Sequence, residues 1–337
     1  AKSLDTAIDT LIASPSPESL SAAKAAWLAA RVPYQQSEAF RFGNPIVDDW
    51  EGRVNAWPLD EGLIDYVSAG YGTVSDANDL YTANVIANPK LMVGGKLVDA
   101  SVINTELLTG VLHEAGTVEA NVATGYHAIE FLLWGQDLNG TDAGAGNRPY
   151  TDFDTANCTN GNCDRRAAYL SAASDLLIAD LEEMVANWKD GGAARQEVTG
   201  GDADVGIARI LTGMGSLSYG ELAGERMKLG LLLHDPEEEH DCFSDNTHNS
   251  HYYDALGIQN VYLGSYKRTD GKIVSGASLA GLVAAKDAEL DKALRAALDH
   301  TMTAMKAMKD RAEKTEAYDQ MIGQGNEAGN AVVQAAI

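Results

Sequence analysis

The stretch RRAAYLSAASDLLIADLEEMVANWK, residues 165–189, carries the clearest structural signal in the chain. Its apolar side chains recur at spacings of three, four and seven residues, as they do along one face of an α-helix. We therefore predict a long amphipathic helix that buries one face in a core. The members of this face are Leu170, Leu177, Leu181, Met184 and Trp188.

Helical periodicity extends over most of the 337 residues, whereas alternating runs of Val, Ile and Thr of comparable length are absent. We therefore predict an all-α fold in which any β-sheet is minor. Met302, Met305 and Met308 lie at three-residue spacing and are predicted to fill a core. The other helical stretches are residues 22–42, interrupted at Pro33; residues 104–135, as one or two helices with weak points at Gly116 and Gly125; and residues 278–314, as two helices.

Three long segments lack this pattern: residues 43–62, 136–164 and 234–257. Loops of this length in a compact chain are usually functional or disordered, and we predict functional loops here. The chain length favours about two domains. We place them at residues 1–160 and 161–337, as two helical bundles with the long loops meeting at their junction.

The two bundles could have arisen by internal duplication. Each contains a tyrosine shortly before a glutamate, followed by an acid-rich loop and a further helix. The residues are Tyr34 and Glu38 in the first half, and Tyr219, Glu221 and Glu225 in the second. The match is loose, so duplication and two unrelated bundles both stay open.

The charge of the chain narrows the classes of partner. Forty-nine acidic residues against 25 basic ones give a formal net charge of −24. This charge repels nucleic acid and anionic lipid, and it favours a cation or a small ligand that carries one. No run of apolar residues approaches the length of a membrane-spanning helix. The first ten residues lack the pattern of a signal peptide, so we expect any such segment to lie outside this chain.

Two of the three cysteines bracket an Asn-Gly turn in CTNGNC, residues 158–163. A turn of this length can bring the thiols of Cys158 and Cys163 within bonding distance. We predict a disulfide, which requires an oxidising compartment such as a periplasm or a cell surface. A redox pair usually has two intervening residues, and a metal site would need more soft ligands nearby. Cys242 is left as a free thiol of unknown role.

The stretch GYHAIEFLLWGQD, residues 125–137, places His127 and Glu130 among apolar residues. Positions three apart project from the same face of a helix, so both side chains could reach one ion. An imidazole with a carboxylate suits iron, zinc or manganese. The alternative is that Glu130 accepts a hydrogen bond from His127 or an arginine, with no metal. Both interpretations stay open, because two buried titratable groups need partners of some kind.

A metallopeptidase would use the same pair, but its other ligands are missing. The inverted zincin motif needs a second histidine where Phe131 stands. The commoner motif fails as well, because Thr117 follows His113 and Glu114 in the ligand position. If the helix were continuous, His113 would lie about 21 Å from His127, too far to share an ion.

Two further segments offer polar groups. In EEEHDCFSDNTHNSH, residues 237–251, Glu237 and His240 have the Glu-x-x-His spacing of di-iron bundles. Alternatively, Ser244 or Asp245 caps a helix that starts there. In the first half, the segment RVNAWPLDE, residues 53–61, offers a second set of polar groups. Alternatively, Pro58 with Asp60 and Glu61 could mark the start of a helix. That set consists of Arg53, Trp57, Asp60 and Glu61.

Together these segments resemble the imelysin-like family. GYHAIE fits its Gly-x-His-x-x-Glu motif, and NAWPLDE, CTNGNCDRR and EEEHDCFSDNTH, in this order, are similar to the branch described as iron-regulated protein A. The resemblance implies a helical fold of two bundle-like halves with the motif, Gly125, His127 and Glu130, near their junction. It also implies an exported protein, periplasmic or lipid-anchored at the cell surface, made under iron limitation.

Our leading hypothesis is an exported iron-acquisition protein without enzymatic activity. His127 and Glu130 would bind Fe²⁺ or Fe³⁺, an iron chelate or haem, with zinc as the alternative metal. A membrane iron-uptake component is the expected partner. The competing hypotheses are a metallopeptidase and a surface interaction protein with a structural His–Glu pair. Further ligands or neighbouring groups are expected among Glu38, Arg53, Trp57, Asp60, Glu61, Glu225, Arg226, His240, Asp245 and His248.

Overall fold

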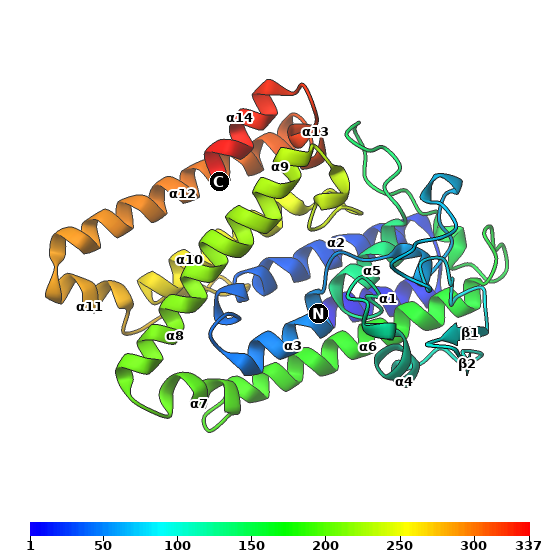
Figure 1. Ribbon diagram of the computed structural model, residues 1–337, viewed down its shortest axis with the longest axis horizontal. Helices are drawn as coiled ribbons and strands as arrows, with labels where there is room; N and C mark the ends of the chain where they lie inside the picture. Colours follow the sequence, from blue (N-terminus) through cyan, green and yellow to red (C-terminus); the bar gives the residue numbers. More distant parts are fainter. The chain divides into compact units, whose positions relative to one another are not determined.

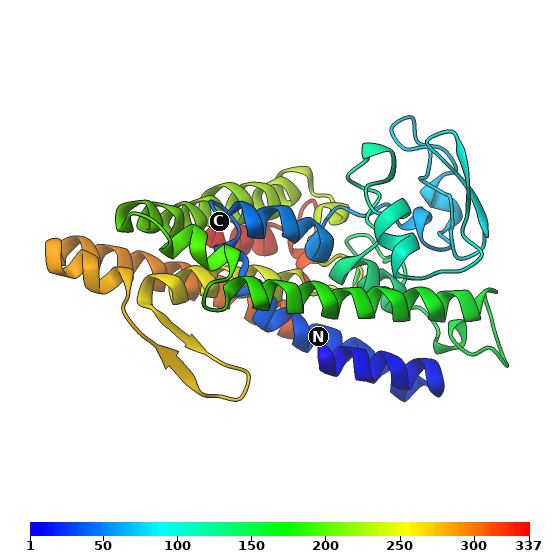
Figure 2. The same ribbon diagram turned by 90° about the horizontal axis from the view of Figure 1, so that it is seen from below.

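The computed structural model describes residues 1–337 and is predominantly helical (Figures 1 and 2). Its strands form two antiparallel hairpins: β1 (Lys90–Val93) pairs with β2 (Lys96–Asp99), and β3 (Ser265–Lys267) pairs with β4 (Ile273–Ser275). The prediction of an all-α fold with only minor sheet is therefore confirmed. None of the helices combines the length and apolarity that crossing a membrane would require.

The chain divides into two compact units, and both are discontinuous in sequence. Because compactness alone does not define a folding domain, the division at residues 160 and 161 stays a prediction. Unit 1 comprises Ala1–Ala30, Trp50–Leu138 and Ala145–Ala186; unit 2 comprises Arg31–Asp49, Asn139–Gly144 and Asn187–Ile337.

Unit 1 contains most of the longest predicted helix. α6 spans Cys163–Trp188 and buries Leu170, Leu177 and Met184, as its stripe predicts. The other α-helices to which unit 1 contributes are α1 (Lys2–Ala13), α2 (Pro17–Gln35), α3 (Pro45–Asn55), α4 (Thr105–Leu107) and α5 (Gly125–Trp134). Short 3₁₀ turns cover Glu61–Leu63, Ala69–Tyr71, Ala115–Thr117 and Tyr150–Asp152, and a π-helical turn covers Leu108–Leu112.

Two predictions about these elements need correction. The segment 43–62 is not all loop, because it contains α3, with a proline at its first position where the missing N–H costs nothing. α2 continues through Pro33, which lies in its last turn. Residues 104–135, predicted as one or two helices, form two separate stretches: the first ends at Leu112, and α5 begins at Gly125, one of the two predicted weak points.

One arginine of α6 fixes the base of the β1–β2 hairpin. The Arg165 guanidinium donates hydrogen bonds to the carbonyls of Val85 and Ile86 before the hairpin, and to those of Ala100 and Ser101 after it, at 2.7–2.8 Å. Both stems are therefore held by a single side chain.

The predicted disulfide is present. Cys158 and Cys163 are bonded, with their Cα atoms 5.9 Å apart, and Cys163 begins α6. Arg166, one turn into the helix, donates to the carbonyl of Gly161 within the closed loop. Cys242 takes no part in a disulfide.

Unit 2 is built mainly from the second half of the chain. α12 packs along α10, α11 and α14. The β3–β4 hairpin follows α10 and extends away from it before the chain enters α11 (Figure 2). Its helices are α7 (Ala193–Thr199), α8 (Ala203–Gly215), α9 (Leu229–Leu233), α10 (Thr247–Leu263), α11 (Leu279–Lys286), α12 (Ala288–Lys314), α13 (Tyr318–Ile322) and α14 (Glu327–Ala336), with 3₁₀ turns at Glu38–Phe40 and Pro236–Glu238 and a π-helical segment, Ser216–Lys228, that joins α8 to α9.

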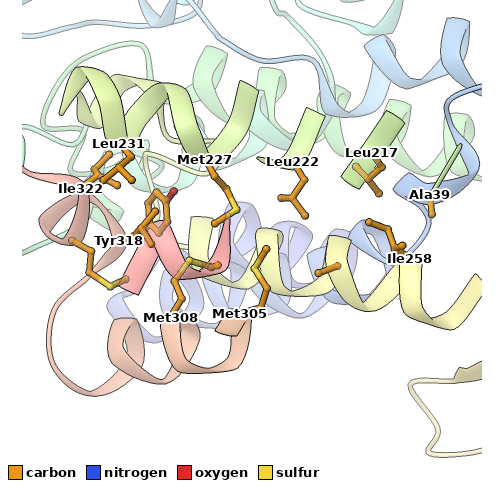
Figure 3. Packing of buried hydrophobic residues seen from close by; sticks show 14 residues of the cluster. Ala39, Leu217, Leu222, Met227, Leu231, Ile258, Met305, Met308, Tyr318 and Ile322 are labelled. Atoms are coloured by element: carbon orange, nitrogen blue, oxygen red, sulfur yellow. The ribbon is translucent and has the colours of Figure 1, made fainter. Parts of the chain in front are cut away.

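The methionines of α12 lie in the core of unit 2, as predicted. Met305 and Met308 are 2% and 0% exposed, and Met302 packs against the same cluster. Figure 3 shows Met305 and Met308 close to Met227, with Tyr318 in the same cluster. Flexible thioethers fill the irregular space where several helices meet.

Candidate functional site

The helix that carries the predicted metal ligands begins at a glycine for a steric reason. Gly125 has φ +82°, and a Cβ atom there would lie 2.5 Å from the carbonyl oxygen of Val54. Thr124 donates from its hydroxyl to the carbonyl of Arg53 at 2.8 Å, which also fixes this point against the end of α3. The motif glycine therefore allows the close approach of two backbones.

Replacing Gly125 with alanine is expected to lower the free energy of unfolding by about 2 to 3 kcal/mol, because the left-handed backbone and the contact with Val54 both oppose a side chain. Urea denaturation followed by circular dichroism measures the change. Gly110→Ala is the control, since no atom lies within 4 Å of a Cβ placed there. Equal stability of the two variants would contradict this reading of the motif.

His127 and Glu130 are bonded to each other. The Nδ1 atom of His127 lies 2.9 Å from Oε2 of Glu130, and the two side chains are 1% and 0% exposed. An ionised Glu130 can only accept, so Nδ1 is the donor in this contact, and in a neutral imidazole Nε2 then carries the lone pair. Carboxylates orient metal-binding histidines in this way. The contact is equally consistent with the alternative, in which Glu130 accepts a hydrogen bond from His127 and no metal is bound.

Aromatic side chains hold α5 in place within unit 1. The indole N–H of Trp27 donates to the carbonyl of Tyr126 at 2.9 Å, and its ring packs edge-on against Trp134, with centroids 5.4 Å apart. The ammonium of Lys24 lies 5.1 Å from the centre of the Trp134 ring. Burial, with the charge of Arg148, lowers the pKa of Lys24 to about 8. All ten residues of α5 are buried, so the orientation of His127 is rigidly set.

The segment 53–61 contributes groups that are paired within unit 1. Arg53 forms ion pairs with Asp180 and Glu183, each at 2.9 Å, so it binds the protein's own carboxylates. Asp60 accepts from the Asn78 amide at 2.6 Å, and burial raises the pKa of Asp60.

Glu61 is 6% exposed and Trp57 is half-buried. The 3₁₀ turn starts at Glu61 rather than at Pro58. These residues lie in unit 1 with His127.

The histidine tested for a zincin motif lies close to the start of α5 because the chain turns back after Leu112. The Nδ1 atom of His113 accepts from the backbone N–H of Ala123 at 3.3 Å. Burial lowers the pKa of His113. The distance expected for a continuous helix therefore does not apply, because the helix is interrupted between Leu112 and Gly125.

A buried ion-pair network in unit 1 was missed by sequence reasoning. Asp65 accepts from Arg148 at 2.8 Å and from two nitrogens of Arg166 at 2.6 and 2.9 Å. Burial opposes ionisation of Asp152, but a hydrogen bond from Tyr66 and the two guanidinium groups lower its pKa. The available signal was the pair of arginines that follows Cys163 in a largely apolar helix.

Unit 2 contains a second charged cluster, centred on Arg226. Its guanidinium contacts Glu38 and Glu221, each at 2.9 Å, and Asp254 at 3.1 Å. Arg226 and Glu38 were both predicted as site residues, and the structure brings them together with 2% exposure each. Burial raises the pKa of Asp254 well above its usual value. Arg226 thus binds carboxylates of the protein itself.

In the acid-rich segment of unit 2, Asp241 forms an ion pair and a hydrogen bond with other side chains. Asp241 forms an ion pair with Arg31 at 2.7 Å and accepts from the Asn246 amide at 2.7 Å. Thr247 donates to Glu239 at 2.8 Å. The predicted ligand His240, in the same segment, is 2% exposed.

Two histidines of α10 lie in the same region. Burial lowers the pKa of His248 to about 4 and that of His251 to about 3. His251 is fully buried, edge-on against Tyr318 with ring centroids 5.2 Å apart. Both imidazoles are therefore neutral at pH 7.

Two predicted residues of unit 2 are less buried than their neighbours. Glu225 is exposed, and Asp245 is half-buried with φ +54°. Glu237 and His240 do not share a helix face, because the 3₁₀ turn ends at Glu238 and the chain is extended at Glu239. Asn246, rather than Ser244 or Asp245, occupies the N-cap position of the helix after this loop, without a side-chain capping hydrogen bond.

Sequence reasoning passed over Arg31 and Asp254 altogether, and it named Asp241 and His251 only as members of the acidic segment. The signal for Arg31 was a charged residue at a core position of α2, next to the buried Ala30 and Tyr34. Asp254 is a single acid in the buried face of α10. A charge at a core position implies a buried partner, although the sequence does not say which one.

The family model described as Imelysin (Peptidase_M75) matches residues 1–337. The chain belongs to the imelysin family. Among solved structures, this imelysin-family chain is similar to a protein assigned as an iron-regulated protein A precursor from Parabacteroides distasonis. The TM-score is 0.61 at 19% identity, over 99% of this chain and 88% of the other, which shows a shared fold. No curated protein matches the sequence.

Proposed function

We propose that this imelysin-family protein is an exported iron-acquisition protein that binds iron, an iron chelate or haem through the imidazole of His127. The observation that carries the proposal is the buried 2.9 Å contact between His127 and Glu130. A carboxylate on Nδ1 makes Nε2 the basic nitrogen, which is the arrangement that a metal-binding imidazole needs. In this proposal Glu130 orients the ligand instead of coordinating the metal.

Three further observations support the proposal. The net charge of −24 favours cations. The disulfide between Cys158 and Cys163 is stable in an oxidising, exported compartment. The fold is shared with a protein assigned as iron-regulated. A peptidase has less support, because Phe131 replaces the second helix-borne histidine that zinc hydrolysis would need.

Titration of the metal-free protein with Fe(II), Fe(III) citrate, Zn(II) and haem tests the proposal. We expect His127→Ala to abolish binding of one of these ligands. Glu130→Gln should weaken binding of the same ligand by about 10- to 100-fold, as for other groups that orient metal-bound histidines. His300→Ala, which removes an exposed histidine of α12, is the control for adventitious binding and should change nothing.

The outcomes separate the metal-binding hypothesis from the structural one. If His127→Ala binds every ligand as the wild type does but melts at a lower temperature, the pair is structural and the proposal is wrong. A peptide-cleavage assay on the metal-loaded protein and on Glu130→Gln tests the peptidase alternative directly.

A further inference from the structure

Unit 2 contains a cavity. Its lining includes none of the residues discussed above as metal ligands. Its volume is about 570 Å³, within the range of small-molecule sites in proteins. The wall is formed by residues between Ala39 and Asn44, the last residue of α6, the helices α7, α8, α10 and α11, and the segment that leads from the β3–β4 hairpin into α11.

Most of the wall is apolar and aromatic. Phe40 packs against Trp188 with ring centroids 5.5 Å apart, and Ile207 and Ile210 of α8 line the cavity beside Val261. Phe40 is 42% exposed, so part of this apolar surface faces water. An apolar ligand that covered it would gain free energy in proportion to the area removed from water.

One residue that lines the cavity, Asn44, has incomplete hydrogen bonding. Asn44 is 3% exposed, and its amide nitrogen donates to the carbonyl of Ala194 at 2.9 Å. That contact fixes the amide orientation, because a carbonyl can only accept. The other atom, Oδ1, is buried with no partner in the protein. A buried acceptor without a donor is costly, and a ligand donor would remove the cost.

The charge next to Asn44 is already neutralised. Arg209 donates to the carbonyl of Gly43 at 2.7 Å, which places its guanidinium next to Asn44. The same group forms an ion pair with Glu197 at 2.7 Å. An anionic ligand would meet Glu197 as well as Arg209, and a cation would meet Arg209, so the site favours an uncharged head group.

We propose that this cavity binds a small uncharged amphipathic molecule. Its apolar body would lie against Phe40, Trp188 and Ile210, and a hydroxyl or N–H group would donate to Oδ1 of Asn44. This inference is independent of the iron-binding proposal, since it uses a different part of the chain and a different chemistry.

Two fluorescence probes that differ by one donor test the proposal. N-phenyl-1-naphthylamine is uncharged and has a single N–H, and phenyl 1-naphthyl ether has an oxygen in its place. We expect saturable one-to-one binding of the amine to the full chain. The ether should compete with an affinity about fivefold lower, which is the effect of one neutral hydrogen bond.

Three variants locate the binding. In Asn44→Leu the two probes should bind equally, and retained binding of the ether shows that the variant is folded. Ile210→Gln should weaken both probes at least fivefold. Leu211→Gln is the matched control on the same helix, because Leu211 is 52% exposed and does not line the cavity.

No saturable binding of the amine would overturn the proposal. Equal effects of Ile210→Gln and Leu211→Gln would overturn it too, since the probe would then bind elsewhere on the surface. If the amine keeps its advantage over the ether in Asn44→Leu, the assignment of Asn44 as the acceptor is wrong.

Discussion

Replacing Asp65 with asparagine is expected to destabilise unit 1 by about 4 kcal/mol, the usual cost of removing one partner from a buried ion pair. Asp65 is 1% exposed and accepts hydrogen bonds from both Arg148 and Arg166. The asparagine would leave two buried guanidinium groups to share Asp152. The loss is large because these charges cannot reach water in the folded state.

Urea denaturation of the wild type and Asp65→Asn gives the difference in the free energy of unfolding. Asp310→Asn is the matched control: Asp310 pairs with Lys306 and Lys314 on the exposed side of α12. Surface pairs of this kind contribute at most about 1 kcal/mol. A loss of less than that in Asp65→Asn would mean that water reaches the network.

Acidification from pH 7.5 to pH 5 is expected to destabilise unit 2 by about 4 kcal/mol through two histidines. Burial holds the pKa of His248 at about 4 and that of His251 at about 3, against 6.5 in the unfolded chain. Below pH 6.5 the unfolded chain therefore binds protons that the folded one does not. Stability falls as the pH drops from about 6.5, and each histidine contributes about 2 kcal/mol by pH 5.

Neighbouring charged groups also contribute to this pH dependence. His251 lies near Arg226 and Asp241, and His248 lies near Lys309 and Glu313. Asp254 acts in the opposite sense: its raised pKa means that the folded state takes up a proton before the unfolded one does.

A variant that cannot be protonated isolates the histidine contribution. Urea denaturation at pH 7.5, 6 and 5 should show that His251→Leu loses about 2 kcal/mol less than the wild type over this range. His300→Gln, at an exposed position, should follow the wild type. Parallel pH profiles for wild type and His251→Leu would show that His251 is protonated without cost.

Helices could be predicted from the sequence where their apolar residues recur with a clear helical period. α6 was predicted within two residues at each end, because its apolar stripe is long and uninterrupted. α3 was missed although Val47, Trp50 and Val54 lie at helical spacing and are buried. Its proline, glycine and acidic residues are typical of loops, so the segment was predicted as a loop although it has a short amphipathic pattern.

The candidate site followed from sequence only where its residues are local. The spacing of His127 and Glu130 placed them on one helix face, and their mutual hydrogen bond was one of the two alternatives. Partners far apart in sequence could not be paired in this way. Arg31 and Asp241 are separated by 210 residues, and no local spacing relates them. Their pairing depends on the tertiary fold of unit 2.

The hydrogen bonds from Arg165 to the β1–β2 hairpin have a consequence for insertions and labels at the hairpin tip. One guanidinium binds the carbonyls on both stems, and the backbone N–H of Ala100 donates to the carbonyl of Pro89, so the base of the hairpin is fixed at these two residues. The tip, Gly94–Gly95, can therefore be lengthened, shortened or labelled with a dye or an epitope without a change in the register of β1 and β2. Replacing Arg165 with alanine would remove all four of these hydrogen bonds at once.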